Sequence, residues 1–168
     1  MQVTWWPVKD AFLYDVLRLE NGVWVSRGMV QGLEFTESIV SGQIYAYTVR
    51  AMKIDETTSP NGVPDLVGTF GFTDEALVPG ATWIKLAHLT ELRSAANKLR
   101  ALAGLTPFAW AETTPSFIRR THVVELRAAI AAARTAIGVS PLAFSDDPLA
   151  TQGVVRAVHF QELRDAVR

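Results

Sequence analysis

Apolar and polar residues alternate through the first 70 residues in the way that is typical of β-strands. Two such runs cover residues 12–19 and 23–30, and Asn21-Gly22 lies between them. Asn-Gly tolerates positive φ at both central positions of a type I′ turn, which joins two adjacent antiparallel strands. We therefore predict a β-hairpin over residues 12–30.

A second pair of strands is predicted over residues 33–39 and 43–52, joined through Ser41-Gly42. In the longer strand Tyr45, Tyr47, Val49 and Ala51 recur with a period of two, so we expect this face to be buried. Residues 59–62, Ser-Pro-Asn-Gly, then form a turn into a last extended segment that ends near residue 69.

The second half of the chain changes to the three-four spacing of amphipathic helices and repeats itself. Segments 84–93, 118–127 and 155–164 align on the motif His-x-x-Glu-Leu-Arg, which contains every histidine of the protein. The repeated motif residues are His88, Glu91 and Arg93; His122, Glu125 and Arg127; and His159, Glu162 and Arg164. Gly104 and Gly138 suit the helix ends, so we predict helical repeats at about 72–104, 110–138 and 144–168.

Composition supports a folded protein and argues against several classes of partner. Of the 168 residues 49% are apolar and 20% are charged, and 16 Lys plus Arg face 17 Asp plus Glu. A nearly neutral chain offers no broad basic surface for nucleic acid or anionic lipid, and no apolar run approaches the ~20 residues that span a bilayer. We expect neither nucleic-acid binding nor membrane insertion. The absence of cysteine removes thiol chemistry and disulfides.

The first half resembles a fibronectin type III domain. The resemblance rests on Val-Thr-Trp at 3–5, Tyr-Asp-Val at 14–16, Phe-Thr-Glu at 35–37, the run at 42–51 and Ser-Pro at 59–60. These match the second through the last strand of that family, and the first strand has no counterpart. The resemblance implies an incomplete immunoglobulin-like β-sandwich over residues 1–70, followed by a small all-α three-repeat domain over residues 71–168.

The second half resembles tandem repeats found in C-terminal regions of large bacterial secreted or surface proteins, often after fibronectin type III domains. This resemblance rests on the His-x-x-Glu-Leu-Arg motif and implies an extracellular or cell-surface location. It implies a non-enzymatic structural or adhesion module, either part of a larger precursor or of a filament. The expected partner is protein, from neighbouring domains or from other copies. The alternative is a carbohydrate-binding accessory module that binds a glycan.

The histidine motif allows a metal hypothesis and a structural one. His and Glu at i and i+3 share a helix face, so three pairs could supply N and O ligands to an ion. Stacked repeats, however, place equivalent residues about 10 Å apart, too far for one ion. We expect His88, His122 and His159 to close the first helical turn or to bond a neighbouring segment, and we expect the Glu and Arg residues to form salt bridges between repeats. We predict no catalytic residue, metal ligand or cofactor.

Two other groups of residues carry weaker hypotheses. The acidic pairs Asp74-Glu75 and Asp146-Asp147 lie in turns, where Asp commonly bonds the local backbone, so we favour neither calcium binding nor catalysis there. Val3, Trp5 and Trp6 lie on the strand next to the missing first strand. We expect an exposed edge there, completed by an upstream segment or by a strand of a neighbouring molecule, and only one of the two tryptophans can be buried.

Overall fold

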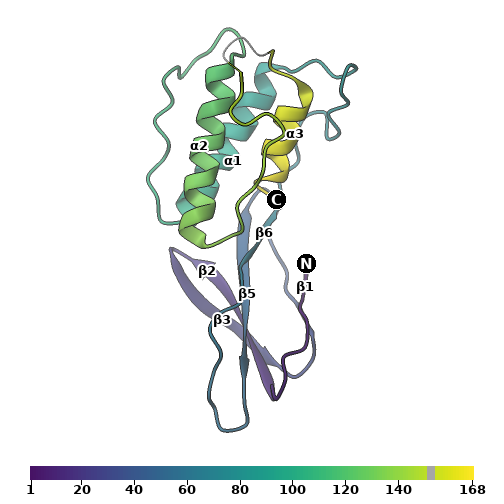
Figure 1. Cartoon of the computed structure of the whole chain (residues 1–168), viewed down its shortest axis with the longest axis vertical. Helices are drawn as coiled ribbons and strands as arrows, with labels where there is room; N and C mark the ends of the chain where they lie inside the picture. Colours follow the sequence, from purple (N-terminus) through teal and green to yellow (C-terminus); the bar gives the residue numbers. More distant parts are fainter. Residues whose placement is uncertain (151–153) are drawn as a thin grey trace.

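The computed structural model describes residues 1–150 and 154–168, so residues 151–153 of the expected third repeat lie outside the described residues. The described part contains six strands followed by three helices, which confirms the mixed β and α composition predicted from the sequence. The strands gather at one end of the molecule and the helices at the other (Figure 1).

The strands form two antiparallel sheets. The first sheet pairs β1 (Gln2–Thr4) with β4 (Glu34–Thr36). The second has the order β3-β2-β5-β6, with bounds Val23–Val30, Leu13–Glu20, Ile44–Met52 and Asp65–Gly68. The β2–β3 turn places Asn21 and Gly22 at φ 50° and 79°, the pair of positive values that the predicted hairpin requires.

Side chains between the two sheets hold them together as a sandwich. The rings of Trp5 and Tyr14 lie 5.5 Å apart. Just after β4, the Glu37 carboxylate accepts hydrogen bonds from the Tyr47 hydroxyl at 2.6 Å and from Arg18 at 3.0 Å. Burial, together with the bond to Glu37, raises the pKa of Tyr47 to about 12. Tyr47 and Arg18 belong to the four-stranded sheet, so this cluster fixes the small sheet against the large one.

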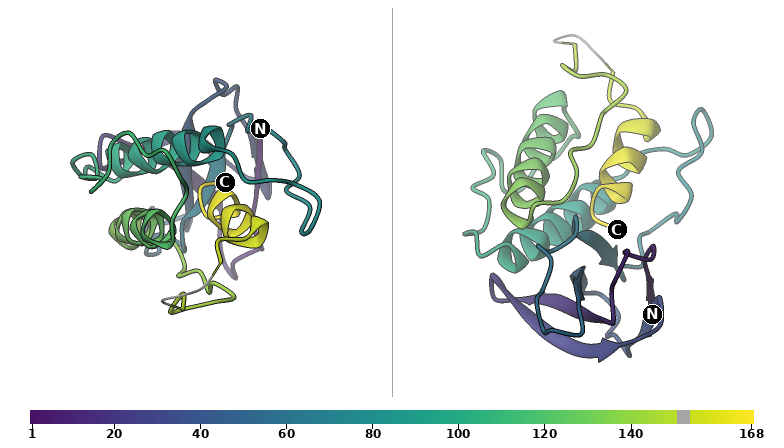
Figure 2. Two further views of the ribbon diagram at one scale, coloured as in Figure 1. Left: turned by 90° about the horizontal axis from the view of Figure 1, so that it is seen from above. Right: turned by 60° about the horizontal axis from the view of Figure 1, so that its bottom comes forward.

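The three helices are α1 (Leu86–Leu102), α2 (Arg120–Ile137) and α3 (Ala157–Asp165). The three helices run in the same direction. Residues at the starts of all three helices line one depression, and the ends of the helices lie against the strands. At that junction Lys98 donates to the Gly42 carbonyl at 2.5 Å, and Val167 lies directly beside Gly68. Figure 2 shows the end of α3 directed toward the sheets.

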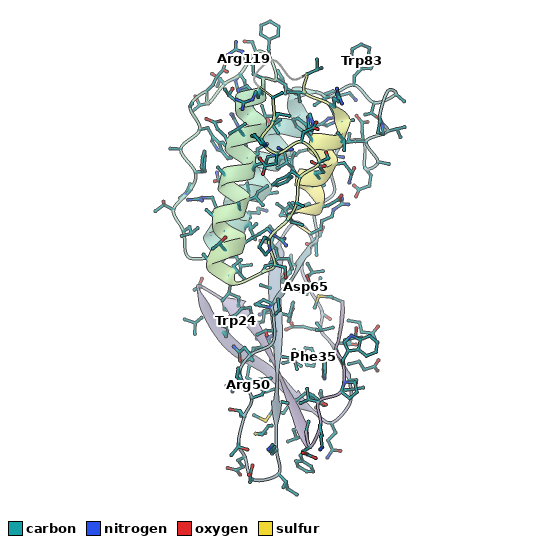
Figure 3. All side chains as sticks on the ribbon, viewed as in Figure 1. Trp24, Phe35, Arg50, Asp65, Trp83 and Arg119 are labelled. Atoms are coloured by element: carbon teal, nitrogen blue, oxygen red, sulfur yellow. The ribbon has the colours of Figure 1, made fainter. Side chains whose placement is uncertain are left out.

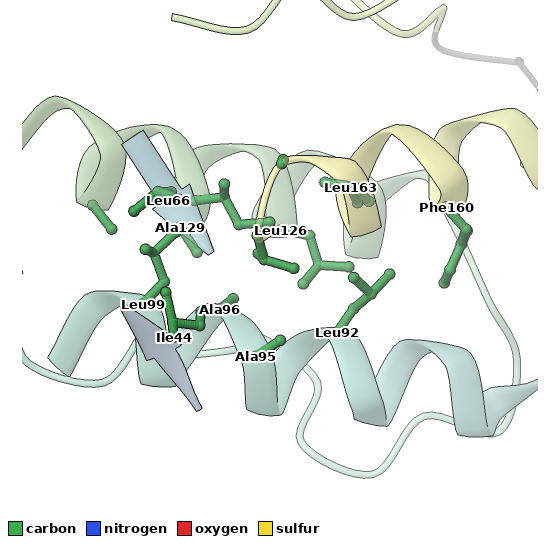
Figure 4. Close-up of a cluster of buried hydrophobic side chains, with 14 of the residues drawn as sticks. Ile44, Leu66, Leu92, Ala95, Ala96, Leu99, Leu126, Ala129, Phe160 and Leu163 are labelled. Atoms are coloured by element: carbon green, nitrogen blue, oxygen red, sulfur yellow. The ribbon is translucent and has the colours of Figure 1, made fainter. Parts of the chain in front are cut away.

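The helices and the large sheet share one hydrophobic core. Leu92, Leu126 and Phe160 from the helices are fully buried, and Ile44 and Leu66 from the sheet belong to the same cluster (Figure 4). The sequence pattern indicated one buried face for the strand at 43–52. That expectation was incomplete, because Ile44 and Ala46 on its opposite face are also buried, against the helices. The helical core thus extends to the large sheet, while Tyr14, Val16 and Tyr47 are buried outside this cluster.

Candidate functional site

Each motif histidine closes the start of its own helix. The ring Nδ1 accepts a hydrogen bond from the backbone N–H three residues earlier, at the N-cap position. The three pairs are Lys85 with His88 at 3.3 Å, Arg119 with His122 at 3.1 Å and Arg156 with His159 at 3.1 Å. An accepting Nδ1 carries no proton, so the proton of the neutral ring is on Nε2. The imidazole therefore takes the place of the Glu or Gln at the N3 position of a capping box, whose side chain accepts from the N-cap N–H.

The same histidines also hold the chain segment that precedes each helix. We call residues 72–74, 110–112 and 144–146 the hooks of the three repeats. The Nε2 atoms donate to a hook carboxylate: His88 to Asp74 at 3.1 Å, His122 to Glu112 at 3.1 Å and His159 to Asp146 at 2.9 Å. A hydrogen bond from Lys85 holds the pKa of Asp74 below its ordinary value, and the bond from His159 does the same for Asp146.

The motif glutamates bind the backbone of the same hooks. Glu125 accepts from the Ala111 N–H and Glu162 from the Ser145 N–H, both at 2.9 Å. Glu91 accepts from both the N–H and the hydroxyl of Thr73, at 3.1 and 2.5 Å. Each hook is thus fixed to its own helix by one histidine and one glutamate.

The motif arginines connect the repeats to one another in a closed ring. Each arginine pairs with the glutamate of the next repeat, and the third pairs with the first: Arg93 with Glu125 at 3.6 Å, Arg127 with Glu162 at 3.4 Å and Arg164 with Glu91 at 3.8 Å. Each guanidinium also stacks on the aromatic residue of that next hook: Arg93 on Trp110 at 4.8 Å, Arg127 on Phe144 at 4.3 Å and Arg164 on Phe72 at 4.8 Å. The repeats surround a common centre and are not stacked in a row.

Arg164 makes the contact that closes the ring. Its side chain is completely buried, and it donates to the backbone carbonyls of Asp74 at 2.7 Å and Thr73 at 2.6 Å. Burial lowers the pKa of Arg164, and the Glu91 carboxylate opposes that effect. Nε is buried without a hydrogen-bond partner among the described residues in all three motif arginines, and in Arg93 the Nη2 atom also lacks one. The three arginines are therefore equivalent in position but unequal in bonding.

These contacts involve the same histidine and carboxylate side chains for which the sequence raised metal binding, calcium binding or catalysis. The described residues contain no group of three or more His, Asp or Glu side chains that could hold a metal ion. Asp74 and Asp146 each accept from a histidine, and Glu75 accepts from Arg168 and from the Phe72 N–H. The arrangement fixes loops to helices.

The strand β1 leaves one of its edges unpaired within the described chain. Its pairing with β4 continues on both sides, through Met1 with Glu37 and Trp5 with Leu33. Because antiparallel pairing alternates, the amides and carbonyls of Gln2 and Thr4 point away from β4. Trp6 is 89% exposed, whereas Val3 and Trp5 are half-buried, so the structure buries Trp5 and leaves Trp6 in solvent.

A groove of about 550 Å³ lies between this free edge and β6. Its walls include Val3, Trp5 and Val8 on the β1 side and Val63, Leu66 and Val67 on the β6 side. The indole N–H of Trp5 is buried without a hydrogen-bond partner in the described structure. The groove therefore combines apolar walls with unused backbone and indole groups.

At the opposite end of the molecule, three apolar side chains project around the helix starts. Trp83, Phe117 and Val154 are 87%, 70% and 71% exposed and line a depression of about 760 Å³ (Figure 3, where Trp83 is labelled). Sequence reasoning missed this group. The available signal was its recurrence, because each residue lies two positions before the N-cap residue of its helix.

Comparisons of the chain with protein-family models, with curated proteins and with solved structures found no match. In the described part of the chain, no helix is both long enough and apolar enough to cross a membrane.

Replacing one histidine tests its structural role. We expect His122→Ala to lower the free energy of unfolding by about 1–3 kcal/mol, because it removes both the bond that closes the first turn of α2 and the bond to Glu112 of the hook, and leaves a cavity where a buried ring stood. Val124→Ala, a partly exposed change on the same helix, is the matched control and should cost less. Chemical denaturation measures both. Stoichiometric zinc, iron or manganese in the desalted wild-type protein, found by elemental analysis, would contradict the structural assignment.

Equivalent arginine substitutions test the closure of the ring. We expect Arg164→Met to destabilise the protein by roughly 3 kcal/mol, because two hook carbonyls and Glu91 lose a buried cationic partner. Arg93→Met makes the same chemical change at the equivalent position, and it should cost clearly less because Arg93 bonds no hook carbonyl in the described structure. Thermal unfolding of both variants decides the order. Equal losses would show that the hydrogen bonds of Arg164 add nothing to closure.

Proposed function

We propose that this chain is a non-enzymatic structural or adhesion module of a bacterial extracellular or cell-surface protein. In this proposal a fibronectin type III-like sandwich without its first strand precedes a domain of three helical repeats. The module belongs to a larger surface polypeptide or to a filament assembled by strand addition, and its partners are proteins.

The order of strands supports the fibronectin type III-like part. If β1 is counted as the second of seven strands, the small sheet contains strands two and five, and the large sheet contains four, three, six and seven in that order. Sandwiches of this class divide their strands between the sheets in a similar way, with the first strand beside the second. That place is the unpaired edge of β1.

Recurring contacts support the repeat part. Every motif histidine, glutamate and arginine makes a corresponding contact in all three units, although the aligned segments differ at most other positions. Contacts that recur in this way serve the architecture of the repeat itself. The resemblance of these repeats to those of bacterial surface proteins is what suggests the location.

The single observation that carries the functional proposal is the free edge of β1 above an apolar groove. Unpaired strand edges readily accept another strand, and many sandwich proteins associate by this route. The completing strand comes from an upstream segment of the same polypeptide or from a neighbouring molecule. The second route gives a head-to-tail assembly.

The oligomeric state of the purified chain tests assembly. We expect the mass measured by light scattering to rise with protein concentration, because exposed edges of separate molecules become paired. Thr4→Pro removes an amide that faces away from β4 without breaking a β1–β4 bond, so it should keep the protein folded and monomeric. A wild-type chain that stays monomeric at every concentration contradicts the filament form of the proposal.

Glycan binding is the second candidate function, and the nearly complete exposure of Trp6 and Trp83 favours it. Exposed aromatic rings offer apolar surfaces for sugars. If the candidate is correct, a glycan should quench tryptophan fluorescence in the wild type, and Trp83→Ala or Trp6→Ala should remove the response. No change across a glycan array would exclude sugar binding under those conditions.

A further inference from the structure

We propose that the groove between β1 and β6 binds an extended peptide strand from a neighbouring polypeptide, with apolar residues at alternate positions and a backbone carbonyl bonded to the Trp5 indole. This inference rests on the proposed function, because it names the chemistry of the strand that completes the sandwich.

The backbone of β1 presents the donors and acceptors that another backbone requires. Gln2 and Thr4 direct their amides and carbonyls to the open side, while Met1 and Trp5 bond β4. Such groups repeat every second residue along a strand, a spacing that a second extended chain matches. A sugar or an alkyl chain lacks this repeat and would leave most of these groups without partners.

The walls of the groove select the side chains of the occupant. Val3 and Trp5 face it from β1, and Val67 lines it from β6, whereas the Leu66 side chain packs into the core shared with the helices. Val63, which is largely exposed, lies at its rim. A strand beside β1 directs every second side chain toward these residues and the others to solvent. The occupant therefore alternates apolar with polar residues, and the apolar ones remove the exposed groove walls from water.

The Trp5 indole supplies a specific polar contact. Trp5 lines the groove, and its indole N–H is closed off from solvent without an acceptor among the described residues, so a carbonyl of an occupant reaches it once the ring turns toward the groove. A buried donor without an acceptor costs free energy, and most buried indole groups have a partner. A peptide backbone in the groove offers carbonyl oxygens at a regular spacing, which an apolar ligand does not. The unpaired indole thus favours a peptide over a lipid.

The test uses the full chain and a synthetic peptide of about nine residues that alternates valine and threonine, acetylated and amidated at its ends. Nuclear magnetic resonance titration should show saturable binding, with changes in the Trp5 indole signal and in the amides of Gln2 and Thr4. The indole of Trp83, at the far end of the molecule, should not change (Figure 3). A peptide with proline at alternate positions, which lacks the required amides, should not bind.

Two kinds of variant separate backbone pairing from the indole bond. Thr4→Pro and Gln2→Pro each remove one outward amide, so each should weaken peptide binding at least about tenfold while the thermal unfolding temperature shows that the fold persists. Trp5→Phe keeps the apolar ring and removes the donor, and should weaken binding roughly twofold to tenfold. Trp83→Phe is the matched control and should leave binding unchanged.

The outcomes distinguish this inference from the function on which it rests. Absence of saturable binding, binding unaffected by both proline variants, or signal changes confined to β3 would overturn the peptide groove. If the peptide binds as expected but does not compete with assembly of the chain, the module assembles through another surface, so the groove inference stands and strand addition at β1 is wrong as the route of assembly. If the peptide binds as expected and the chain stays monomeric, the groove inference stands and the filament proposal fails.

Discussion

The helical half of this protein depends on three arginines that connect each repeat to the next. A guanidinium is large, flat and always charged, so it can stack on an aromatic ring and face a carboxylate at the same time. At Arg164 it also bonds two backbone carbonyls of the first hook, which brings the last helix beside the first. These contacts act together with helix packing, because the three helices bury Leu92, Leu126 and Phe160 in one shared core.

The strands depend on the helices in turn. The large sheet buries Ile44 and Ala46 against the helical core, and the small sheet is fixed to the large one through Glu37 and Tyr47. The large sheet and the helices therefore share one buried core. By contrast, β1 pairs with β4 alone and leaves its other edge unpaired within the described residues. A surface can bind a partner most readily where the rest of the fold does not depend on that surface for stability.

Local signals in the sequence predicted the elements well. The Asn21-Gly22 hairpin, the strand at 43–52 and the glycines after α1 and α2 follow from turn chemistry and periodicity, which act over a few residues. The structural role of the histidines followed from their position at the helix starts. The sequence could not show that the three repeats close into a ring, because the repeat pattern is the same whether the repeats stack in a row or form a ring. The pairing of Arg164 with the first hook depends on three-dimensional geometry.

The groove and the exposed residues at the helix starts also could not be predicted from a single sequence. Trp5 and Trp6 alternate on a strand, so one was expected to be buried, but periodicity does not say which neighbour covers it. The unpaired indole of Trp5 emerged only from the arrangement of two sheets. Trp83 and Phe117 precede helices at equivalent places, and only the common direction of the helices brings them around one depression.

The closing contact also determines when the protein can fold during its synthesis. Arg164 bonds the carbonyl of a residue 90 positions earlier in the chain. A ribosome makes the first hook before either of the remaining repeats, so closure over this distance waits until α3 has been synthesised. The strands of the hairpin can pair early because their contacts are local. The ring of repeats, by contrast, closes only when α3 meets the first hook, through a contact between distant parts of the chain.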